Sequence, residues 1–295
     1  MLITPDAWLA GSISGGCLES DIVHTAWERT QDGPALVEYD ATADDDILLG
    51  FGLGCSGATI VLMTRLPIDG GVLAFLEEAL TSSIGGEIET VLEPGPHFGA
   101  SRGRIGESEW RNLGEEFAEG HEILRERIEP PFPLLVFGAG HDAIPLARLA
   151  AELGWRVTVV DGRTTHAIPD RFPAAQGVIV AAPNAAPDRI ELPPGGAAVL
   201  MTHSYLNDLA LLKWLLPSEL GYVGSLGPVA RRDRLLADLD RAGRSPTEEQ
   251  SERLHAPIGL DLGATGPEEI ALSIVAEILA WRRGRGGGSR RDERA

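Results

Sequence analysis

Cysteine is scarce in this chain of 295 residues. Only Cys17 and Cys55 occur, and they form no CxxC pair. Small disulfide-bonded domains and structural zinc sites both depend on clusters of closely spaced cysteines. The sequence therefore argues against a disulfide framework and against a structural zinc site.

Basic residues and long apolar runs are also in short supply. The chain has 25 Lys and Arg against 44 Asp and Glu, a formal net charge of −19. A surface of this sign repels a phosphate backbone, so nucleic acid is not an expected partner. No apolar run reaches membrane-spanning length, and the chain does not open with the apolar region of a signal peptide. We expect a soluble, cytoplasmic protein.

The length is sufficient for two hydrophobic cores, because single domains usually run to about 100–200 residues. The proline-rich stretch at residues 129–133 reads EPPFP and predicts a stiff, extended connector. We predict an N-terminal domain over residues 1–128 and a second domain over residues 129–284. The Gly/Arg-rich tail over residues 285–295 is expected to be disordered.

The second domain is organised around a glycine turn in residues 134–163, which read LLVFGAGHDAIPLARLAAELGWRVTVVDGR. An apolar strand over residues 134–137 leads into Gly138, Gly140 and Ala143. This is the Gly-x-Gly-x-x-Ala pattern of dinucleotide-binding folds, in which the glycines allow a tight turn and close approach of a pyrophosphate. The N–H groups of Gly140 and His141 are expected at a helix N-terminus.

A helix and a second strand follow the turn. Apolar residues recur at helical spacing as far as Leu153, and Gly154 predicts the end of the helix. A strand over residues 156–160 then ends at Asp161, the position of the acid that binds a ribose hydroxyl in such folds. Arg163 beside it leaves a preference for NAD or NADP open. The order of these features predicts an α/β fold with a Rossmann-like parallel sheet.

The alternation of strands and helices continues after Asp161. Strands are predicted at residues 177–181, 197–201 and 222–225, and helices at 206–216, 229–239 and 267–283. Ligands bind at the carboxyl ends of parallel strands. The residues expected there are Thr202, His203, Ser225 and Gly227. His203 can act as an acid, a base or a ligand, or it can be a neutral donor in the loop.

The N-terminal domain contains both cysteines in glycine-rich turns. A strand over residues 8–14 runs into Gly15, Gly16 and Cys17, and an amphipathic helix follows over residues 18–30. A thiol at a helix N-terminus has a lowered pKa and is a better nucleophile or metal ligand. Alternatively, Cys17 is a small buried residue packed beside glycines.

Further along, strands are predicted at residues 35–39 and 58–63, and Cys55 precedes the second of them. The two cysteines can then face one pocket. The acidic run at residues 44–46 can bind a hard cation, but a solvated turn is the favoured interpretation. A helix at residues 73–80 is expected to cover this small sheet, and residues 94–122 are expected to be irregular.

Five motifs in the same order together resemble one known family. They are GSISGGCLESDI, GFGLGCSG, IEPPFPLLVFGAGHDAIPLARLA, YVGSLGPVARRDRLL and LHAPIGLDLGATGPEEIALSIVAEILAWR. They closely resemble the XdhC/CoxI family of xanthine and carbon monoxide dehydrogenase accessory factors, over nearly the whole chain. Family members usually have a further strand and an Arg-containing Gly-Ser-rich segment before the residues seen here. The resemblance therefore leads us to expect an N-terminal domain truncated at its start.

The resemblance implies a maturation factor rather than an enzyme that turns over a metabolite. Such a protein binds the molybdenum cofactor and protects it while a cysteine desulfurase helps to install its sulfido ligand. It then hands the cofactor to a molybdenum hydroxylase. The phosphate of molybdopterin, or the pyrophosphate of its cytosine dinucleotide form, suits N–H groups at a helix start. A soft thiolate at Cys17 or Cys55 suits molybdenum or sulfur transfer. A homodimer is also compatible with the sequence.

The alternative is an NAD(P)-dependent oxidoreductase. In that hypothesis Asp161 binds the ribose and His203 donates a proton. Other catalysts are disfavoured, since the sequence has no Walker loop, no HExxH motif and no nucleophile elbow.

Overall fold

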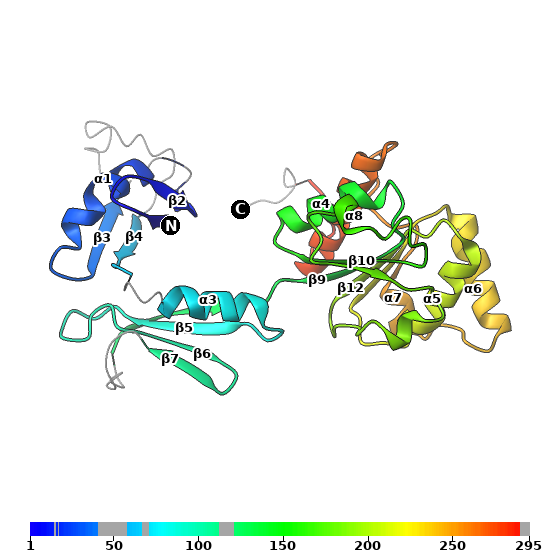
Figure 1. The fold of residues 1–295 in the computed structure, drawn as a ribbon, viewed down its shortest axis with the longest axis horizontal. Coiled ribbons are helices and arrows are strands. Elements are labelled where there is room, and N and C mark those ends of the chain that lie inside the picture. Colours follow the sequence, from blue (N-terminus) through cyan, green and yellow to red (C-terminus); the bar gives the residue numbers. More distant parts are fainter. Residues whose placement is uncertain (15, 17, 41–57, 67–70, 112–120, 290–295) are drawn as a thin grey trace. The chain divides into compact units, whose positions relative to one another are not determined.

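The structure is a computed structural model, and it describes residues 1–14, 16, 18–40, 58–66, 71–111 and 121–289. The chain divides into two compact units, Met1–Pro130 and Pro131–Ala295 (Figure 1). Each unit has hydrophobic clusters of its own, so each has its own core.

The C-terminal unit is built on a six-stranded sheet in which every neighbouring pair of strands is parallel. The strands lie in the order β11-β10-β9-β12-β13-β14. The chain therefore starts in the middle at β9, winds outward to β11, and returns to β12 on the other side of β9. This is the doubly wound order of nucleotide-binding folds, and its topological switch point lies between β9 and β12. The strands are β9 (Pro133–Phe137), β10 (Arg156–Asp161), β11 (Gly177–Val180), β12 (Ala197–Leu200), β13 (Tyr222–Ser225) and β14 (Leu254–His255).

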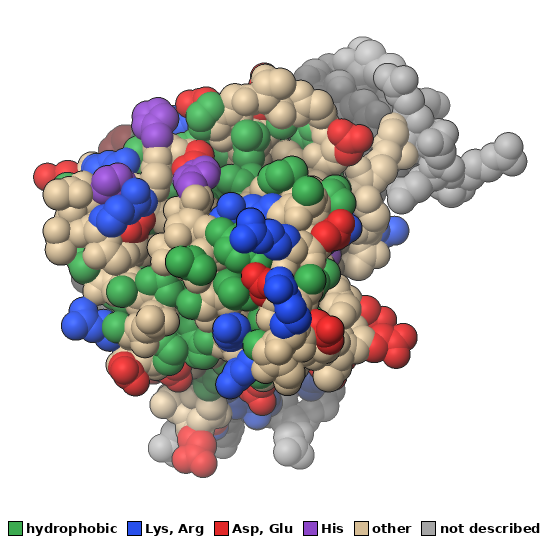
Figure 2. Space-filling model, turned by 90° about the vertical axis from the view of Figure 1, so that its right-hand side faces the viewer, with side chains coloured by type: hydrophobic (Ala, Val, Ile, Leu, Met, Phe, Trp, Pro, Cys, Tyr) green, Lys and Arg blue, Asp and Glu red, His purple; other side chains and the backbone are tan. Residues whose placement is uncertain are grey.

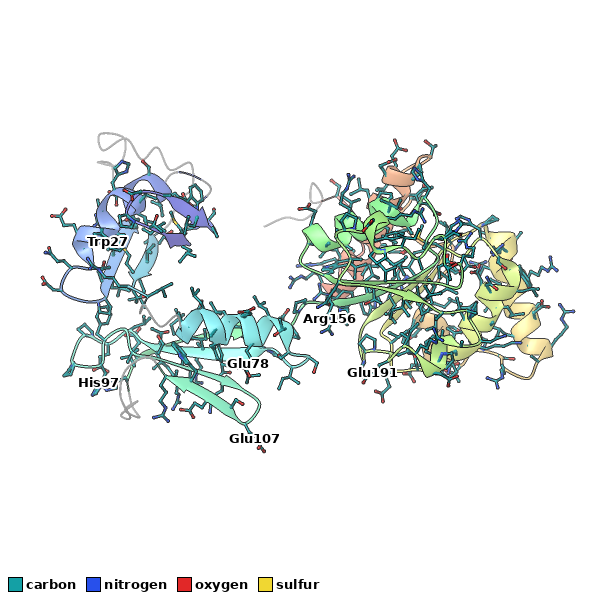
Figure 3. The ribbon with its side chains drawn as sticks, in the orientation of Figure 1. Trp27, Glu78, His97, Glu107, Arg156 and Glu191 are labelled. Atoms are coloured by element: carbon teal, nitrogen blue, oxygen red, sulfur yellow. The ribbon has the colours of Figure 1, made fainter. Side chains whose placement is uncertain are left out.

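Helices cover both faces of this sheet, which explains the continuous apolar strands. In β9, Leu134 and Val136 pack toward α4 and α8, whereas Leu135 and Phe137 pack toward α5 and α6. Figures 1 and 3 show these helix pairs on opposite faces, with side chains filling the space between the layers. The prediction of an α/β fold with a Rossmann-like parallel sheet is confirmed. The helices are α4 (Ala143–Glu152), α5 (Tyr205–Leu215), α6 (Val229–Arg241), α7 (Glu248–Glu252) and α8 (Pro267–Arg282).

The helix after the glycine turn follows the predicted pattern with one exception. Ala143, Leu146 and Ala150 are fully buried in α4, and Gly154 follows its C-terminus with a φ of +74°. A residue in this left-handed conformation ends a helix. Leu153, which the periodicity placed on the apolar face, is 47% exposed, because it lies at the C-cap where the helix has already ended.

The first part of the N-terminal unit packs one helix on a two-stranded antiparallel sheet. The helix is α1 (Glu19–Arg29), and the strands of this sheet are β3 (Ala35–Asp40) and β4 (Ala58–Met63). A second two-stranded antiparallel sheet consists of β1 (Leu2–Ile3) and β2 (Trp8–Ala10). Leu18 and Ile22 pack on Tyr39, Val61 and Met63. The strand predicted over residues 8–14 is shorter than expected, because residues 12–14 hydrogen-bond to a side chain of α1 and not to a neighbouring strand.

The second part of the N-terminal unit corrects two predictions. This part contains a four-stranded antiparallel sheet in the order β7-β6-β5-β8, and β6 and β7 lie within residues 94–122, which were expected to be irregular. The predicted helix at residues 73–80 exists as α3, but it packs on this sheet and not on β3 and β4. The elements are α3 (Gly71–Thr81), β5 (Gly86–Val91), β6 (Ser101–Ile105), β7 (Ser108–Arg111) and β8 (Ile123–Ile128).

The strands β6 and β7 lack the usual alternation of apolar and polar residues for a physical reason. Phe75 of α3 lies so close to Gly103 that a Cβ there would come within 2.6 Å of its ring. Position 103, which faces the core, therefore holds no side chain, whereas Ile105 two residues later packs in the same cluster as Phe75. Trp110 of β7 supplies the apolar surface by stacking on Phe75, with 5.9 Å between ring centroids.

Glu89 in the middle of this sheet predicts a pH-dependent stability. Its carboxylate is 2% exposed and accepts hydrogen bonds from Arg102 and Arg125 on the two neighbouring strands. Burial opposes ionisation, but the two arginines outweigh it and hold the pKa of Glu89 below its usual value. A carboxyl with a depressed pKa stabilises the fold above its unfolded-state pKa, and this stabilisation is lost as the pH falls below about 4.5.

Replacing Glu89 by alanine is expected to lower the free energy of unfolding of this unit by about 1–3 kcal/mol at pH 7, because two arginines lose a buried carboxylate to which both donate hydrogen bonds. The control is Glu87→Ala on the same strand, since Glu87 is 44% exposed in its pair with Arg104. Urea denaturation at pH 7 and pH 4 measures both effects. Equal losses for the two variants would contradict this role of Glu89.

Two surface properties bear on possible partners. No helix in the described ranges is long and apolar enough to cross a membrane. On the face of the molecule shown in Figure 2, Lys and Arg side chains stand among acidic and hydrophobic ones and form no continuous basic patch.

Candidate functional site

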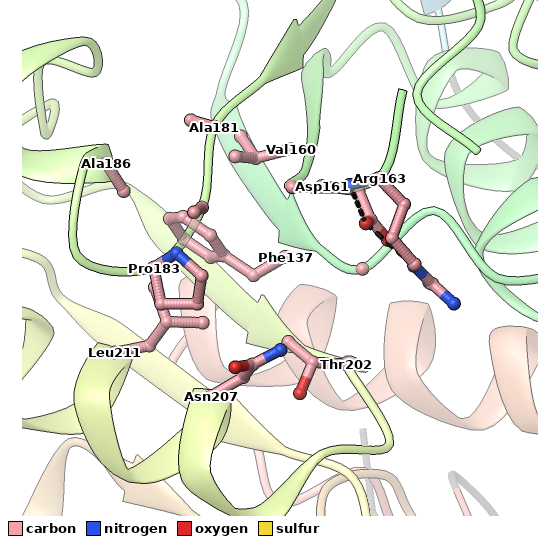
Figure 4. Close-up of a pocket in the computed structure, with 13 residues that line it drawn as sticks. Phe137, Val160, Asp161, Arg163, Ala181, Pro183, Ala186, Thr202, Asn207 and Leu211 are labelled. Carbon is pink, nitrogen blue, oxygen red and sulfur yellow. Dashed lines mark hydrogen bonds and ion pairs between the residues drawn. The ribbon is translucent and has the colours of Figure 1, made fainter. Parts of the chain in front are cut away.

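A cavity of about 280 Å³ lies at the carboxyl ends of β9, β10, β11 and β12, beside the switch point (Figure 4). Open parallel sheets bind their ligands at this position. About half of its wall is apolar, and the polar groups come from two strand ends and from the first turn of α5. The lining residues are Phe137, Gly138, Val160, Asp161, Gly162, Arg163, Ala181, Ala182, Pro183, Ala186, Thr202, Asn207 and Leu211.

Gly138 allows two loops to meet beside this cavity. Its φ is +118°, a conformation that residues with a side chain rarely adopt. A Cβ on Gly138 would lie 2.3 Å from the carbonyl oxygen of Met201, at the end of β12. The turn after β9 is therefore pressed against the loop after β12, and only glycine fits between them.

The carboxylate of Asp161 holds the glycine turn, and its two oxygens accept four hydrogen bonds. The N–H of Ala139 donates to Oδ2 at 2.7 Å, and the backbone N–H of Arg163 donates to Oδ1 at 2.8 Å. The guanidinium of Arg163 adds Nε to Oδ1 at 2.9 Å and Nη2 to Oδ2 at 2.7 Å. Burial opposes the charge of Asp161, but the bonds from Arg163 and Ala139 outweigh it and lower the pKa to about 2. Asp161 is therefore ionised at neutral pH.

An imidazole and a carboxylate bridge the two loops across the switch point. Nε2 of His203 lies 2.8 Å from Oδ2 of Asp142, at the start of α4. His203 has a φ of +56° and a side chain that is 60% exposed. A Cβ on Gly140 would lie 2.6 Å from Oδ1 of Asp142 and 3.8 Å from His203 Nε2. The pair therefore lies over the glycine turn.

Buried polar groups fix the loop that contains His203. Asp208, 1% exposed in the first turn of α5, accepts a hydrogen bond from the hydroxyl of Thr202. Its other oxygen accepts from Nε and Nη2 of Arg231 on α6. The hydroxyl of Ser204 accepts the N–H of Asn207 and caps α5. Residues 202–207 therefore have a defined path along the rim of the cavity.

The comparisons with known proteins agree with this fold and with one another. The protein-family model described as "XdhC Rossmann domain" matches residues 134–278 of this chain. A second family model, "XdhC and CoxI family", matches residues 1–40. A protein of Bacillus subtilis, named as a probable component of xanthine dehydrogenase, is 34% identical over 289 residues. The match covers 92% of this chain and 84% of that protein.

The chain belongs to the XdhC and CoxI family.

Two further relatives extend the comparison of this XdhC/CoxI family member. The Escherichia coli protein named "Molybdenum cofactor insertion chaperone PaoD" is 23% identical over 289 residues, which covers 96% of this chain and 77% of that protein. A crystal structure described as a xanthine dehydrogenase from Bacillus halodurans is 30% identical, with a TM-score of 0.82. The match covers 96% of this chain and 86% of that one.

The structure brings only some of the predicted site residues together. Gly138, Asp161, Arg163 and Thr202 line the cavity. Gly140, His141 and His203 lie in the adjoining loops, outside the set that lines it. Ser225 and Gly227 lie at and after the end of β13, beyond β12, and are not among the lining residues either.

In the N-terminal unit, Gly16 is part of a loop held by Glu19. Its N–H donates to Oε2 of Glu19 at 2.7 Å, and Ile13 and Ser14 donate to Oε1. Glu19 is 2% exposed, and the bonds from Ser14 hold its pKa well below the usual range. The other predicted residues of this region, Gly15, Cys17 and Cys55, lie outside the described residues, as does the acidic run at residues 44–46.

Three residues at or beside the cavity were not predicted from the sequence. Asn207 lines it from α5, Asp142 pairs with His203, and Arg171 donates from Nη1 to the carbonyl oxygen of Ala139 in the glycine turn. Asn207 follows the N-cap by three positions on the helix, which is the one sequence signal that points to it. Within the described ranges no group of three potential metal ligands occurs.

Proposed function

We propose that this chain is a maturation factor for a molybdenum hydroxylase of the xanthine dehydrogenase type. In this function it binds the molybdenum cofactor and delivers it to the hydroxylase. The observation that carries the proposal is a ligand-sized cavity at the switch point of the Rossmann unit, in a family whose relatives are named for xanthine dehydrogenase and for cofactor insertion.

The residues at the cavity fit the organic part of the cofactor. Phe137, Val160 and Leu211 give apolar walls for a flat ring system, and Asn207 can hydrogen-bond to a ring edge. The half-exposed Arg163 offers N–H groups for a phosphate. When bound, the cofactor supplies the molybdenum chemistry. The protein would hold it, keep water away from one face, and release it to the partner.

The finer steps of the function are part of the same proposal. The chain protects the cofactor while a cysteine desulfurase provides sulfur, and Cys17 or Cys55 supplies the thiolate that contacts molybdenum or sulfur. The cofactor is molybdopterin or its cytosine dinucleotide form, and the chain works as a homodimer in the cytoplasm. The loop held by Glu19 supports this role because it immediately precedes Cys17 in the sequence.

The alternative function, an NAD(P)-dependent oxidoreductase, is favoured by the exposed His203 beside Asp142, which is a suitable proton donor. It is disfavoured by Asp161. A carboxylate has about four lone-pair sites, and four N–H donors already use them. A ribose hydroxyl would have to displace one of these donors.

The test is cofactor transfer between purified proteins. The full chain is loaded anaerobically with molybdenum cofactor, mixed with a cofactor-free xanthine dehydrogenase, and separated from it. We expect molybdenum and activity to appear in the dehydrogenase at least about tenfold faster than with free cofactor, since a bound cofactor is presented in one orientation. Cys17→Ser and Cys55→Ser, compared in parallel, identify the thiol.

Two results would contradict the proposal. One is transfer no faster than with free cofactor. The other is a calorimetric titration in which NAD(H) or NADP(H) binds and molybdopterin does not, which would favour the oxidoreductase. If neither cysteine variant slows the delivery of sulfurated cofactor, the thiol role is wrong and delivery depends on the Rossmann cavity alone.

A further inference from the structure

Arg163 and Asp161 together define the kind of ligand that the cavity accepts. We propose that Arg163 is an anion-binding residue, and that the cavity selects a flat heterocyclic ligand that has a phosphate monoester. Ligands that present an unmodified ribose diol to Asp161 are then poor ligands. This inference rests on the proposed function in taking the cavity as the cofactor site, and it names the group by which the ligand is held.

The first step of the argument is that Asp161 cannot serve as an acceptor for a ligand. Its two oxygens receive four N–H donors at 2.7–2.9 Å. Because the pKa is about 2, the carboxyl group has no proton to donate at neutral pH. A diol would therefore gain a hydrogen bond only by breaking one that already exists, and the net gain would be close to zero.

The second step concerns the N–H groups that Arg163 has left. A guanidinium has five N–H donors in a fixed plane. Nε and one hydrogen of Nη2 are used by Asp161, and the described residues provide no partner for the remaining three. The side chain is 50% exposed and lines the cavity. Three oriented donors beside an open cavity are suited to a phosphate, which has only acceptors when ionised.

The third step is that Arg163 is already oriented. Asp161 fixes the plane of its guanidinium through two parallel hydrogen bonds, and Asp161 is itself fixed by the N–H of Ala139. Binding therefore costs less side-chain entropy than a mobile arginine would lose. The pair Asp161–Arg163 is neutral as a whole. In the adjoining loop, the carboxylate of Asp142 is paired with His203.

The fourth step is the size and polarity of the cavity. At about 280 Å³ its volume is just below that of most ligand sites, which span roughly 300–1,000 Å³. Phe137, Pro183 and Leu211 form apolar walls, and Asn207 lies opposite Arg163 in Figure 4. One ring system fits such a space, with its phosphate at Arg163. Both the phosphate of molybdopterin and the 2′-phosphate of a nucleotide have this chemistry.

The experiment uses two pairs of ligands, and the members of each pair differ by one phosphate group. One pair is molybdopterin cofactor and the same cofactor after treatment with phosphatase, handled anaerobically. The other is 2′,5′-ADP and 5′-AMP. Dissociation constants of the full chain are measured by calorimetry. We expect the phosphorylated member of at least one pair to bind about tenfold tighter or more, as charge-assisted hydrogen bonds allow. The pair that shows the difference identifies the source of the phosphate.

Three variants assign this preference to Arg163. Arg163→Gln is expected to reduce the ratio of the dissociation constants of the two members of a pair to about one. It leaves the backbone N–H groups of Ala139 and Arg163 on Asp161, so the turn remains held. Arg163→Lys should retain part of the ratio, because an ammonium is a point charge without the planar fork. Arg148→Gln, at an exposed position of α4, is the matched control and should not change the ratio.

Several results would overturn the inference. They are equal binding of both members of each pair to the wild-type chain, an unchanged ratio in Arg163→Gln, and no binding of any of the four ligands at millimolar concentration. Unimpaired cofactor transfer by Arg163→Gln with an unchanged ratio would reject this inference alone. A phosphate preference that depends on Arg163, in a chain that never delivers molybdenum, would reject the proposed function alone.

Discussion

Replacing Gly138 by alanine is expected to destabilise the C-terminal unit by about 3–5 kcal/mol. An alanine at a φ of +118° is strained by about 1–3 kcal/mol. The larger part comes from the close approach, because the new Cβ would lie 2.3 Å from the carbonyl oxygen of Met201. The new Cβ would meet only backbone atoms of Met201 and Thr202, so no side chain can rotate away to make room. The turn after β9 and the loop after β12 must separate.

The control for this prediction is Gly154→Ala. Gly154 has a φ of +74°, and a Cβ there would meet no atom within 4 Å. Its replacement is expected to cost only about 1 kcal/mol, from the backbone conformation alone. The stability of the C-terminal unit in both variants is measured by urea denaturation, with hydrogen exchange of peptides from β9 and β12 as the readout. These peptides report on the C-terminal unit separately from the N-terminal unit. If Gly138→Ala costs no more than Gly154→Ala, the loops are not in close contact.

Replacing Asp208 by alanine is expected to cost about 2–4 kcal/mol, since it removes the carboxylate that pairs with Arg231 in a largely buried position. Asp208 is 1% exposed, and the side chain of Arg231 is 22% exposed. The lost hydrogen bond from Thr202 also releases the loop that holds His203. We therefore expect the affinity for any ligand of the cavity to fall together with the stability.

Two variants give this second prediction its controls. Asp208→Asn keeps the size of the side chain and removes the charge, so it isolates the ion pair. Asp233→Ala removes a 59% exposed carboxylate that pairs with Arg232 on the same helix as Arg231. The latter is expected to change the free energy of unfolding by less than about 0.5 kcal/mol. Urea denaturation that gives equal values for Asp208→Ala and Asp233→Ala would contradict the structural role of Asp208.

The central β-α-β segment of the C-terminal unit was predictable from the sequence. Strands buried on both faces are continuously apolar, and Gly138 and Gly154 mark the turn and the helix end through their backbone conformations. These signals are local, so a single sequence contains them. The four-stranded sheet of the N-terminal unit was not predictable in the same way. Gly103 leaves its inward position empty to admit Phe75, a residue of another element.

The pairing of residues at the site shows a second limit. His203 was singled out by its place after a strand, but its partner Asp142 is 61 positions away in the chain. Their meeting depends on β12 lying next to β9, which no local pattern specifies. Likewise, the acid at position 161 was predictable, whereas its saturation by Arg163 and Ala139 depends on distances of tenths of an ångström.

The return of the chain from β11 to β12 determines when, during synthesis, the protein can first bind a ligand in its cavity. During synthesis, β9 and the glycine turn are made before β12, and the 61 residues that separate Asp142 from His203 take roughly 3–12 s at 5–20 residues per second. In that interval one edge of β9 has no partner, and parallel pairing between distant segments is slow. The nascent chain therefore has its glycine turn without the opposite wall of the cavity. Ligand capture has to follow translation of β12 and α5, so a free ligand meets a complete cavity only after these elements have been made.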